Sequence, residues 1–203
     1  YRYKDAALLL QSFFVDHRSH PREYEGKLLQ GDCLFAQNRF EDAIKRYQTI
    51  PADYPELAHL AALQSSDAYR ELGVLGEALA VLRRRAKLSQ DPYRTIEIHL
   101  ASASLQSEND DFDGALASLD ETIEKYGDHP ESENLFDVLQ MRHSLKPFEL
   151  PQSYTEAIDG ERLSLAARFG LLQALELRKQ DQPFRSKEIA LKVANEIPLE
   201  KLS

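Results

Sequence analysis

The sequence predicts an all-α protein in which antiparallel helix pairs repeat along the chain. A short pattern occurs four times, in which an aromatic residue or a leucine stands three positions before an alanine, with an acidic residue between them. The alanines of this pattern, Ala6, Ala43, Ala78 and Ala115, are 37, 35 and 37 residues apart. Self-similarity at a period of about 20–50 residues is typical of repeat proteins, in which each unit packs against its neighbours.

Residues 24–57 contain the clearest unit of the array. Six of its residues stand at offsets 0, 3, 9, 12, 16 and 24, namely Gly31, Leu34, Phe40, Ala43, Tyr47 and Pro55. In an antiparallel pair the small residues belong where the two backbones come closest, which assigns Gly31 to the first helix and Ala43 to the second. Glu41 and Asp42 suit the first turn of the second helix, where the helix dipole attracts negative charge.

These residues and their offsets resemble the tetratricopeptide repeat, a helix–turn–helix unit of about 34 residues. The resemblance implies a right-handed superhelical solenoid that recognises other proteins and catalyses no reaction. It extends over a half repeat and three full repeats, at 1–21, 22–57, 58–91 and 93–130. Repeat ends such as Tyr54-Pro55 are also similar to those of bacterial envelope repeat proteins. That similarity implies the periplasm or an outer-membrane anchor as an alternative location.

The later repeats keep the pattern with substitutions. Ser66 and Ala103 take the place of the small residue in the second and third repeats, and Gly73 makes the inter-helix turn of the second. Residues 131–145 are predicted to form one more helix, so the predicted array spans 1–145.

The C-terminal region departs from the repeat pattern. Residues 146–160 are predicted to be a proline-containing connector, because Pro147 and Pro151 interrupt the helical pattern. A helical period of small and apolar residues then returns at Leu163, Ala166, Ala167, Gly170, Leu171, Ala174, Leu175 and Leu177. Residues 161–203 are therefore expected to form a helical pair, either a divergent repeat or the polar-faced cap that a solenoid end needs.

The composition fits a folded chain and disfavours two kinds of partner. Of the 203 residues, 42% are hydrophobic and 29% are charged, as in ordinary globular domains. The formal net charge of −9 disfavours nucleic acid, whose binding depends on Lys and Arg neutralising phosphates. No apolar run approaches the length of about 18 residues that a transmembrane helix needs, so we expect no membrane insertion.

The chain starts within a predicted second helix, so we expect preceding sequence to supply its first helix. The packing positions of this half repeat are occupied by Tyr3, Ala6, Ala7, Leu10, Phe13 and Phe14. The side that would face the missing helix is then apolar and open, and exposed apolar patches tend to recruit contacts. We therefore expect self-association through the N-terminal half repeat.

Motifs for chemistry are absent or are explained by the repeat. A spacing like that of a calcium-binding loop occurs at Asn109, Asp111, Asp113, Gly114 and Asp120. The repeat alignment instead places 113–115 in the first turn of a helix, where the chain cannot wrap around an ion. The histidines form no metal-binding pattern, and no nucleophile or phosphate-binding motif occurs. We expect no catalytic residue, no cofactor and no metal.

Residues 83–87, Arg-Arg-Arg-Ala-Lys, form the one basic run. They fall in the last turns of a predicted second helix, where cations complement the helix dipole. Our interpretation is a solvated helix end, and the alternative is an anionic contact on the outer surface.

The resemblance places partner binding on the first helices, which line the concave surface of such solenoids. Alignment of the repeats assigns to this surface Glu25, Leu28, Asp32, Phe35, Ala36, Leu60, Leu63, Asp67, Arg70, Glu71, Glu97, Leu100, Ser104, Ser107 and Glu108. Within that set we predict that binding rests on Leu28, Asp32, Phe35, Leu63, Asp67, Arg70, Leu100 and Ser104. The groove would combine an apolar ladder with acidic flanks. The alternative is that its leucines only seal neighbouring first helices together.

These observations predict a non-enzymatic scaffold that binds a peptide or helix of another protein. Apolar anchors with basic flanks would suit the predicted groove. Two alternatives remain open, a scaffold subunit of a bacterial envelope or outer-membrane complex and a ligand-sensing regulatory domain.

Overall fold

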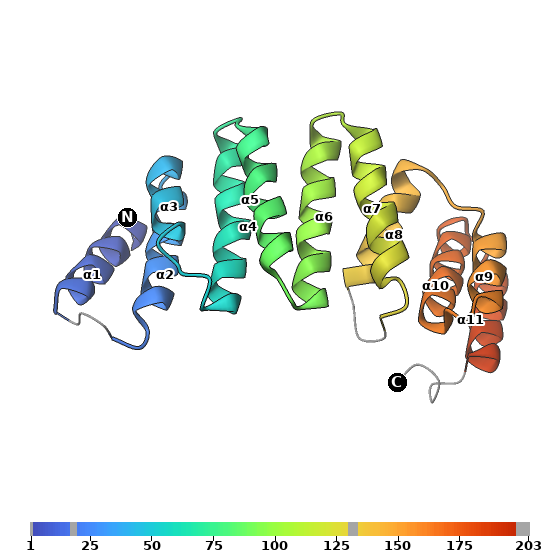
Figure 1. The fold of residues 1–203 in the computed structure, drawn as a ribbon. Helices are drawn as coiled ribbons and strands as arrows, with labels where there is room; N and C mark the ends of the chain where they lie inside the picture. The colour runs from blue at the N-terminus through green and yellow to red at the C-terminus, as the bar shows by residue number, and fades with distance from the viewer. Residues whose placement is uncertain (1, 17–19, 130–133, 198–203) are drawn as a thin grey trace. The chain divides into compact units, whose positions relative to one another are not determined.

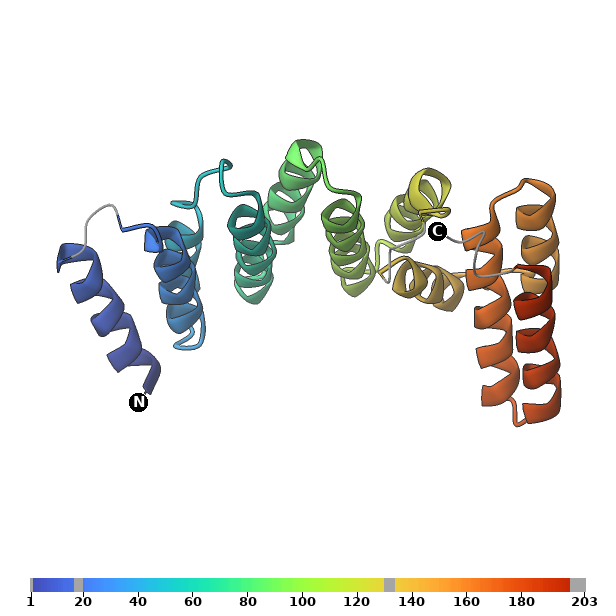
Figure 2. The same ribbon diagram turned by 90° about the horizontal axis from the view of Figure 1, so that it is seen from below.

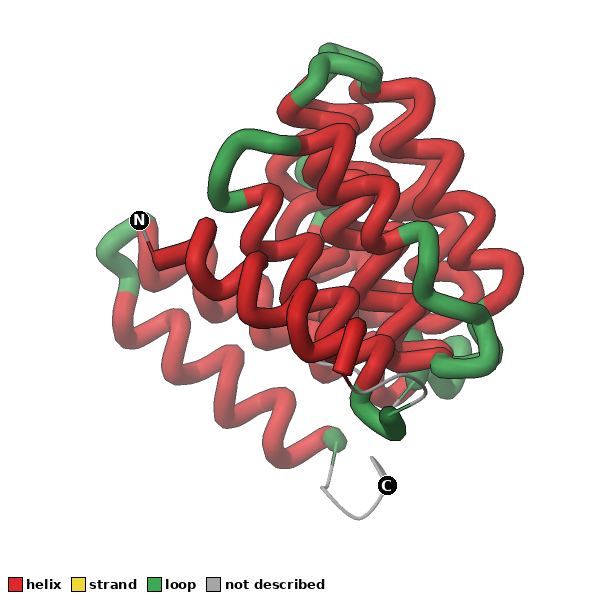
Figure 3. The backbone as a smooth tube through the Cα atoms, turned by 90° about the vertical axis from the view of Figure 1, so that its left-hand side faces the viewer, coloured by secondary structure: helices red, strands yellow, loops and turns green. Residues whose placement is uncertain are grey.

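A computed structural model describes residues 2–16, 20–129 and 134–197 of the chain. Within these ranges the chain forms eleven α-helices and no strand (Figure 1, Figure 3), which confirms the all-α class. The helices are α1 (Arg2–Asp16), α2 (Glu23–Phe35), α3 (Phe40–Tyr47), α4 (Pro55–Glu71), α5 (Leu75–Leu88), α6 (Pro92–Glu108), α7 (Phe112–Tyr126), α8 (Asn134–Leu145), α9 (Leu150–Asp159), α10 (Leu163–Lys179) and α11 (Pro183–Glu196).

The helices gather into two compact units, Tyr1–Leu105 and Gln106–Ser203. The first unit holds α1 to α5 and most of α6, and the second holds the end of α6 with α7 to α11. The division falls inside the third predicted repeat, near the end of α6, and not at the predicted connector.

The first unit is built from antiparallel pairs, α2 with α3 and α4 with α5, as the repeat pattern predicts. The first helices of successive repeats are neighbours. Helix α2 packs against α4, and α4 is joined to α6 by a contact of 2.6 Å between His59 and Glu97. In Figure 2, α4 and α6 lie side by side in one row and α5 lies in a second row. The unit therefore has a layer of first helices and a layer of second helices.

The small residues of the pattern lie where the paired helices touch. Ala43, Ala78 and Ala115 are each fully buried. A Cβ atom on Gly31 would overlap the ring of Tyr47, which is itself 2% exposed. The hydroxyl of Tyr47 returns across the pair to donate a 2.9 Å hydrogen bond to the carboxylate of Asp32. Close approach of α2 to α3 thus depends on a missing side chain at 31.

Five inter-helix turns of the described chain share one backbone conformation. Each has a residue in the left-handed region two positions before the next helix, with φ of 59° at Asn38, 74° at Gly73, 60° at Asp110, 58° at Glu161 and 58° at Asp181. Gly, Asn and Asp adopt this region most readily, because they lack a Cβ or bond locally to the backbone. The turns before α10 and α11 therefore have the same backbone conformation as the turns inside the repeats.

The predicted connector at 146–160 is mostly helical, which corrects that prediction. Helix α9 begins at Leu150 and places Pro151 in its first turn. Proline is well tolerated there, because the amide that it lacks would have no partner within the helix. Helix α9 packs against α10, and α10 packs against α11. The expected C-terminal pair is present as α10 and α11, and α9 adds a third helix to it. Residues 146–149 connect α9 to α8.

The second unit contains a reciprocal pair of helix caps, which we name the capping clasp. Asp128, just after α7, accepts hydrogen bonds at Oδ1 from the backbone amides of Ser164 (2.8 Å) and Leu165 (3.3 Å) at the start of α10. In return, Arg162 and Arg168 donate to carbonyl groups at and after the end of α7, those of Ile123, Glu124, Gly127 and His129. Each helix end thus receives the charge that its dipole favours.

The segment with calcium-loop spacing is the start of a helix. Helix α7 begins at Phe112, as the repeat alignment predicts, and Asp111 is its N-cap. The Oδ1 atom of Asp111 accepts the Gly114 amide at 3.0 Å, and its Oδ2 accepts the Gln106 side chain at 3.0 Å. Among the described residues, no group of three or more His, Cys, Asp or Glu side chains is arranged to hold a metal ion.

Candidate partner-binding site

All eight residues predicted to bind a partner lie on the first helices of the first unit, and all are half-buried. Helix α2 carries Leu28, Asp32 and Phe35, α4 carries Leu63, Asp67 and Arg70, and α6 carries Leu100 and Ser104. Residues three or four positions apart share one side of a helix. The buried residues of α2, which are Gly26, Gln30, Gly31 and Leu34, occupy the other side. We call the unburied sides of α2, α4 and α6 the first-helix face.

The predicted leucine ladder is partly engaged in packing. Leu28 and Phe35 lie against the core cluster around Tyr47, and Leu63 lies against the cluster that contains Leu82 and Ile98. These contacts agree with the sealing role that the sequence left open, and they make Leu63 a poor choice for a surface anchor.

Leu60 on the first-helix face is more accessible than Leu63. It lies one turn before Leu63 on α4 and is 44% exposed. The repeat alignment assigns both leucines to this surface, and the prediction from the sequence names only Leu63 as a binding residue. Leu29 on α2 is 54% exposed, and sequence reasoning missed it. Leu29, Leu60 and Leu63 differ in how deeply they are buried, and a helical sequence pattern alone does not reveal which of neighbouring positions is more exposed.

Two carboxylates of the face lie near one tyrosine. Asp32 accepts the hydroxyl of Tyr47, and burial raises the pKa of Asp32 although this hydrogen bond acts to lower it. Burial and the charges of Asp32 and Asp67 in turn raise the pKa of Tyr47. Asp67 is therefore close enough for its charge to act on the phenol. Arg70 lies 3.5 Å from Asp67 and 3.6 Å from Glu71, so this part of the face carries a network of charges.

A buried histidine ties two first helices together. His59 on α4 is 4% exposed, and its Nε2 lies 2.6 Å from Oε2 of Glu97 on α6. Its Nδ1 is buried without a hydrogen-bond partner among the described residues. The Glu97 side chain stays 46% exposed, so it adds an acid to the first-helix face. The sequence gives no local signal for this contact, because the partner of His59 is 38 residues away.

This geometry defines a helical-repeat protein whose first helices present a surface of apolar and acidic side chains. Residues 25–56, which run from α2 through α3 to the start of α4, match the family model of the tetratricopeptide repeat. No curated protein matches the chain. Repeats of this family generally serve as non-enzymatic modules for protein–protein interaction. None of the helices in the described ranges has the length and apolar character needed to span a membrane.

Proposed function

We propose that the first-helix face binds a peptide or helix of a partner protein that combines an apolar anchor with basic flanks. The observation that carries this proposal is Leu60, an exposed leucine on a face that also holds the carboxylates of Asp32, Asp67 and Glu97. An exposed apolar side chain on a face that also carries acids complements an amphipathic segment with Lys or Arg at its edges.

The carboxylate of Asp32 supports this proposal, because burial disfavours its negative charge although the side chain accepts the Tyr47 hydroxyl. Burial raises its pKa, which means that the charged form is less favourable in the folded chain than in the unfolded chain. An asparagine would accept the same hydrogen bond from Tyr47 without that penalty. A charge kept at some cost in stability fits a role in binding a cation.

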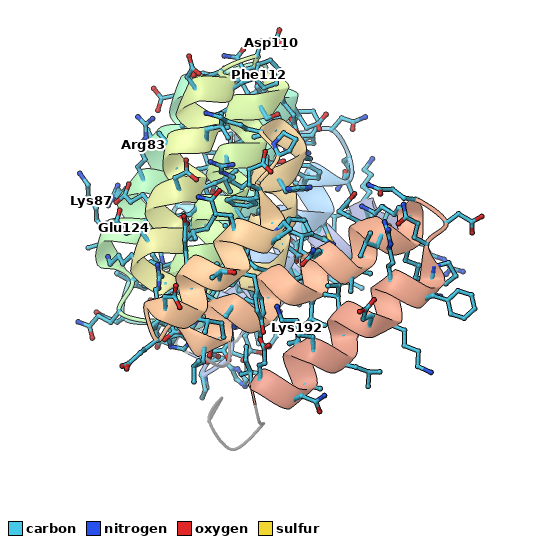
Figure 4. The ribbon with its side chains drawn as sticks, turned by 90° about the vertical axis from the view of Figure 1, so that its right-hand side faces the viewer. Arg83, Lys87, Asp110, Phe112, Glu124 and Lys192 are labelled. Carbon is cyan, nitrogen blue, oxygen red and sulfur yellow. The ribbon has the colours of Figure 1, made fainter. Side chains whose placement is uncertain are left out.

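The test is affinity capture followed by direct binding of the captured partner. Leu60→Arg places a cation where the proposed anchor docks, and loss of an interface anchor typically weakens binding by about 2 kcal/mol or more. Leu60 is exposed, so helix content should stay unchanged. Arg83→Ala is the matched control, since Arg83 is exposed on a second helix (Figure 4). A partner that binds Leu60→Arg as tightly as the unmodified chain would refute the proposal.

The acidic part of the site has its own test. Replacing both Asp32 and Asp67 by Asn should slow association with a basic partner and make the association rate less dependent on salt. Capture of an acidic partner, or an unchanged association rate, would show that Asp32 and Asp67 are not part of the binding site. The envelope-complex and ligand-sensing alternatives stay predictions.

A further inference from the structure

The opposite layer of the first unit contains a furrow between two second helices. Helices α3 and α5 each pack against α4, and a recess of about 490 Å³ lies between them. Its floor is made by Ala58, Ala61, Ala62 and Ser65 of α4, and Ile50 and Val81 stand on its two sides. A second recess of about 470 Å³ shares Ala52, Arg85 and Leu88 with the first. We call these two recesses together the α3–α5 furrow.

Arg85 lines both recesses and is a buried cation without an anionic partner among the described residues. It is 7% exposed, and its Nη2 donates to the carbonyl oxygen of Pro55 at 2.7 Å. Its Nε has no acceptor among the described residues. Burial, with the nearby charge of Arg94, lowers the pKa of Arg85. A buried charge without a counterion is costly, so an anion in the furrow would remove an unfavourable feature of the unliganded chain.

The other cations at the furrow differ in how they are engaged. Arg94 already lies 3.1 Å from Glu56 and 3.3 Å from Asp91. Arg84 lines the recess beside Arg85 and is exposed. Arg83 and Lys87 point outward from α5 (Figure 4). The basic run is therefore divided, with Arg84 and Arg85 at the furrow and Arg83 and Lys87 facing solvent.

We propose that the α3–α5 furrow binds an acidic, apolar segment of a partner protein, with a carboxylate on Arg85 and Arg84 and an apolar side chain on the alanine floor. A planar guanidinium binds a carboxylate through two parallel hydrogen bonds, and Nη2 is the one nitrogen of the Arg85 guanidinium with an acceptor among the described residues. The recess beside it is formed largely by apolar and small side chains, which suits a leucine-sized group. This surface is separate from the first-helix face and does not depend on the function proposed there.

A protein segment fits the furrow better than a polyanion does. The chain carries a net charge of −9, which opposes a surface rich in phosphates. The charge without an anionic partner among the described residues is the buried guanidinium of Arg85 inside a recess, which a flat membrane surface cannot enter. One carboxylate with a neighbouring apolar side chain matches both the charge and the shape.

The experiment uses the whole chain and two blocked peptides. One peptide alternates glutamate and leucine, and the other has glutamine in place of glutamate. Nuclear magnetic resonance should show shifts of the furrow amides and of the Arg85 Nε–H signal with the glutamate peptide and little change with the glutamine peptide. Arg85→Gln should weaken the glutamate peptide by about tenfold or more, because it removes a charge-assisted hydrogen bond at a buried site. Arg83→Gln, which removes the same charge two residues away, should leave the affinity unchanged.

Three results would overturn the proposal. The first is that millimolar glutamate peptide shifts no furrow signal. The second is that Arg83→Gln loses as much affinity for this peptide as Arg85→Gln does. The third is that inorganic phosphate or phosphatidylserine vesicles bind more tightly than the peptide and depend on Arg85. The Arg85 Nε–H signal of the unmodified chain gives a readout even if Arg85→Gln fails to fold. Leu60→Arg should leave peptide binding intact, which separates this surface from the first-helix face.

Discussion

Gly31→Ala tests the packing that defines the first helix pair. An alanine Cβ at this position would overlap Cε1 of Tyr47 and lie 2.7 Å from Cδ1 and 2.9 Å from Cζ of the same ring. The ring cannot turn aside freely, because it is 2% exposed and its hydroxyl bonds to Asp32 at 2.9 Å. We therefore expect α2 and α3 to be forced apart or the hydrogen bond to break.

The expected loss follows from three contributions. Overpacking a buried contact typically costs about 1–3 kcal/mol. A lost hydrogen bond adds about 1 kcal/mol. Alanine regains up to about 1 kcal/mol over glycine through helix propensity. The net expectation for Gly31→Ala is a destabilisation of about 2 kcal/mol, which for a unit of this size lowers the melting temperature by about 10 °C.

The assay is thermal and urea unfolding followed by circular dichroism, with Gly76→Ala as the matched control. Gly76 lies in α5, and a Cβ there would meet no atom within 4 Å. The same substitution should therefore stabilise the chain slightly at Gly76 and destabilise it at Gly31. If Gly31→Ala unfolds at or above the temperature of the unmodified chain, the close approach of α2 and α3 is not what holds this pair.

Three further predictions concern charge, turns and self-association. Because burial raises the pKa of Asp32, the folded state keeps the Asp32 proton to a higher pH than the unfolded state does. The contribution of Asp32 to stability therefore falls as pH rises above the ordinary aspartate pKa of about 4. Asp32→Asn should therefore be more stable than the unmodified chain at pH 7 but not at low pH. Asp32→Ala should be less stable by about 1–3 kcal/mol, because Tyr47 loses its acceptor. Equal unfolding midpoints for the two variants would contradict this. Glu161→Asn should raise stability by about 1 kcal/mol, because asparagine adopts the left-handed region more readily, and chemical denaturation of the chain measures it. Self-association through the N-terminal half repeat would use exposed residues of α1 such as Leu8 (56%) and Leu9 (70%), so a double Glu substitution there should lower the mass seen by light scattering, and a monomer before substitution would exclude the idea.

Much of the fold was predictable because its repeat constrains residue size at fixed positions. Ala43 and Gly31 were assigned from spacing alone, and both lie at the predicted helix contact. The start of α7 at Phe112 was predictable for the same reason. Helix α9 was missed because Pro151 was interpreted as a breaker, although a proline in a first turn can equally start a helix.

The candidate site was predictable as a face but not in its details. Helical spacing assigns residues to a side of α4, but it does not distinguish Leu60, which is exposed, from Leu63, which packs against the core. Contacts between distant residues leave no local signal. The pairing of His59 with Glu97 and the isolation of Arg85 from any described acid became visible only in three dimensions.

The capping clasp has a consequence for how the second unit folds. In a simple repeat array, stability is close to a sum of terms for single units and adjacent interfaces, so one end can fray while the rest stays folded. Asp128 and Arg162 instead join residues 36 to 39 positions apart across two intervening helices, α8 and α9. Helix α10 cannot open without removing the caps of α7. Hydrogen exchange should therefore show α7 and α10 opening together, as one cooperative segment, and not in sequence from the C-terminal end.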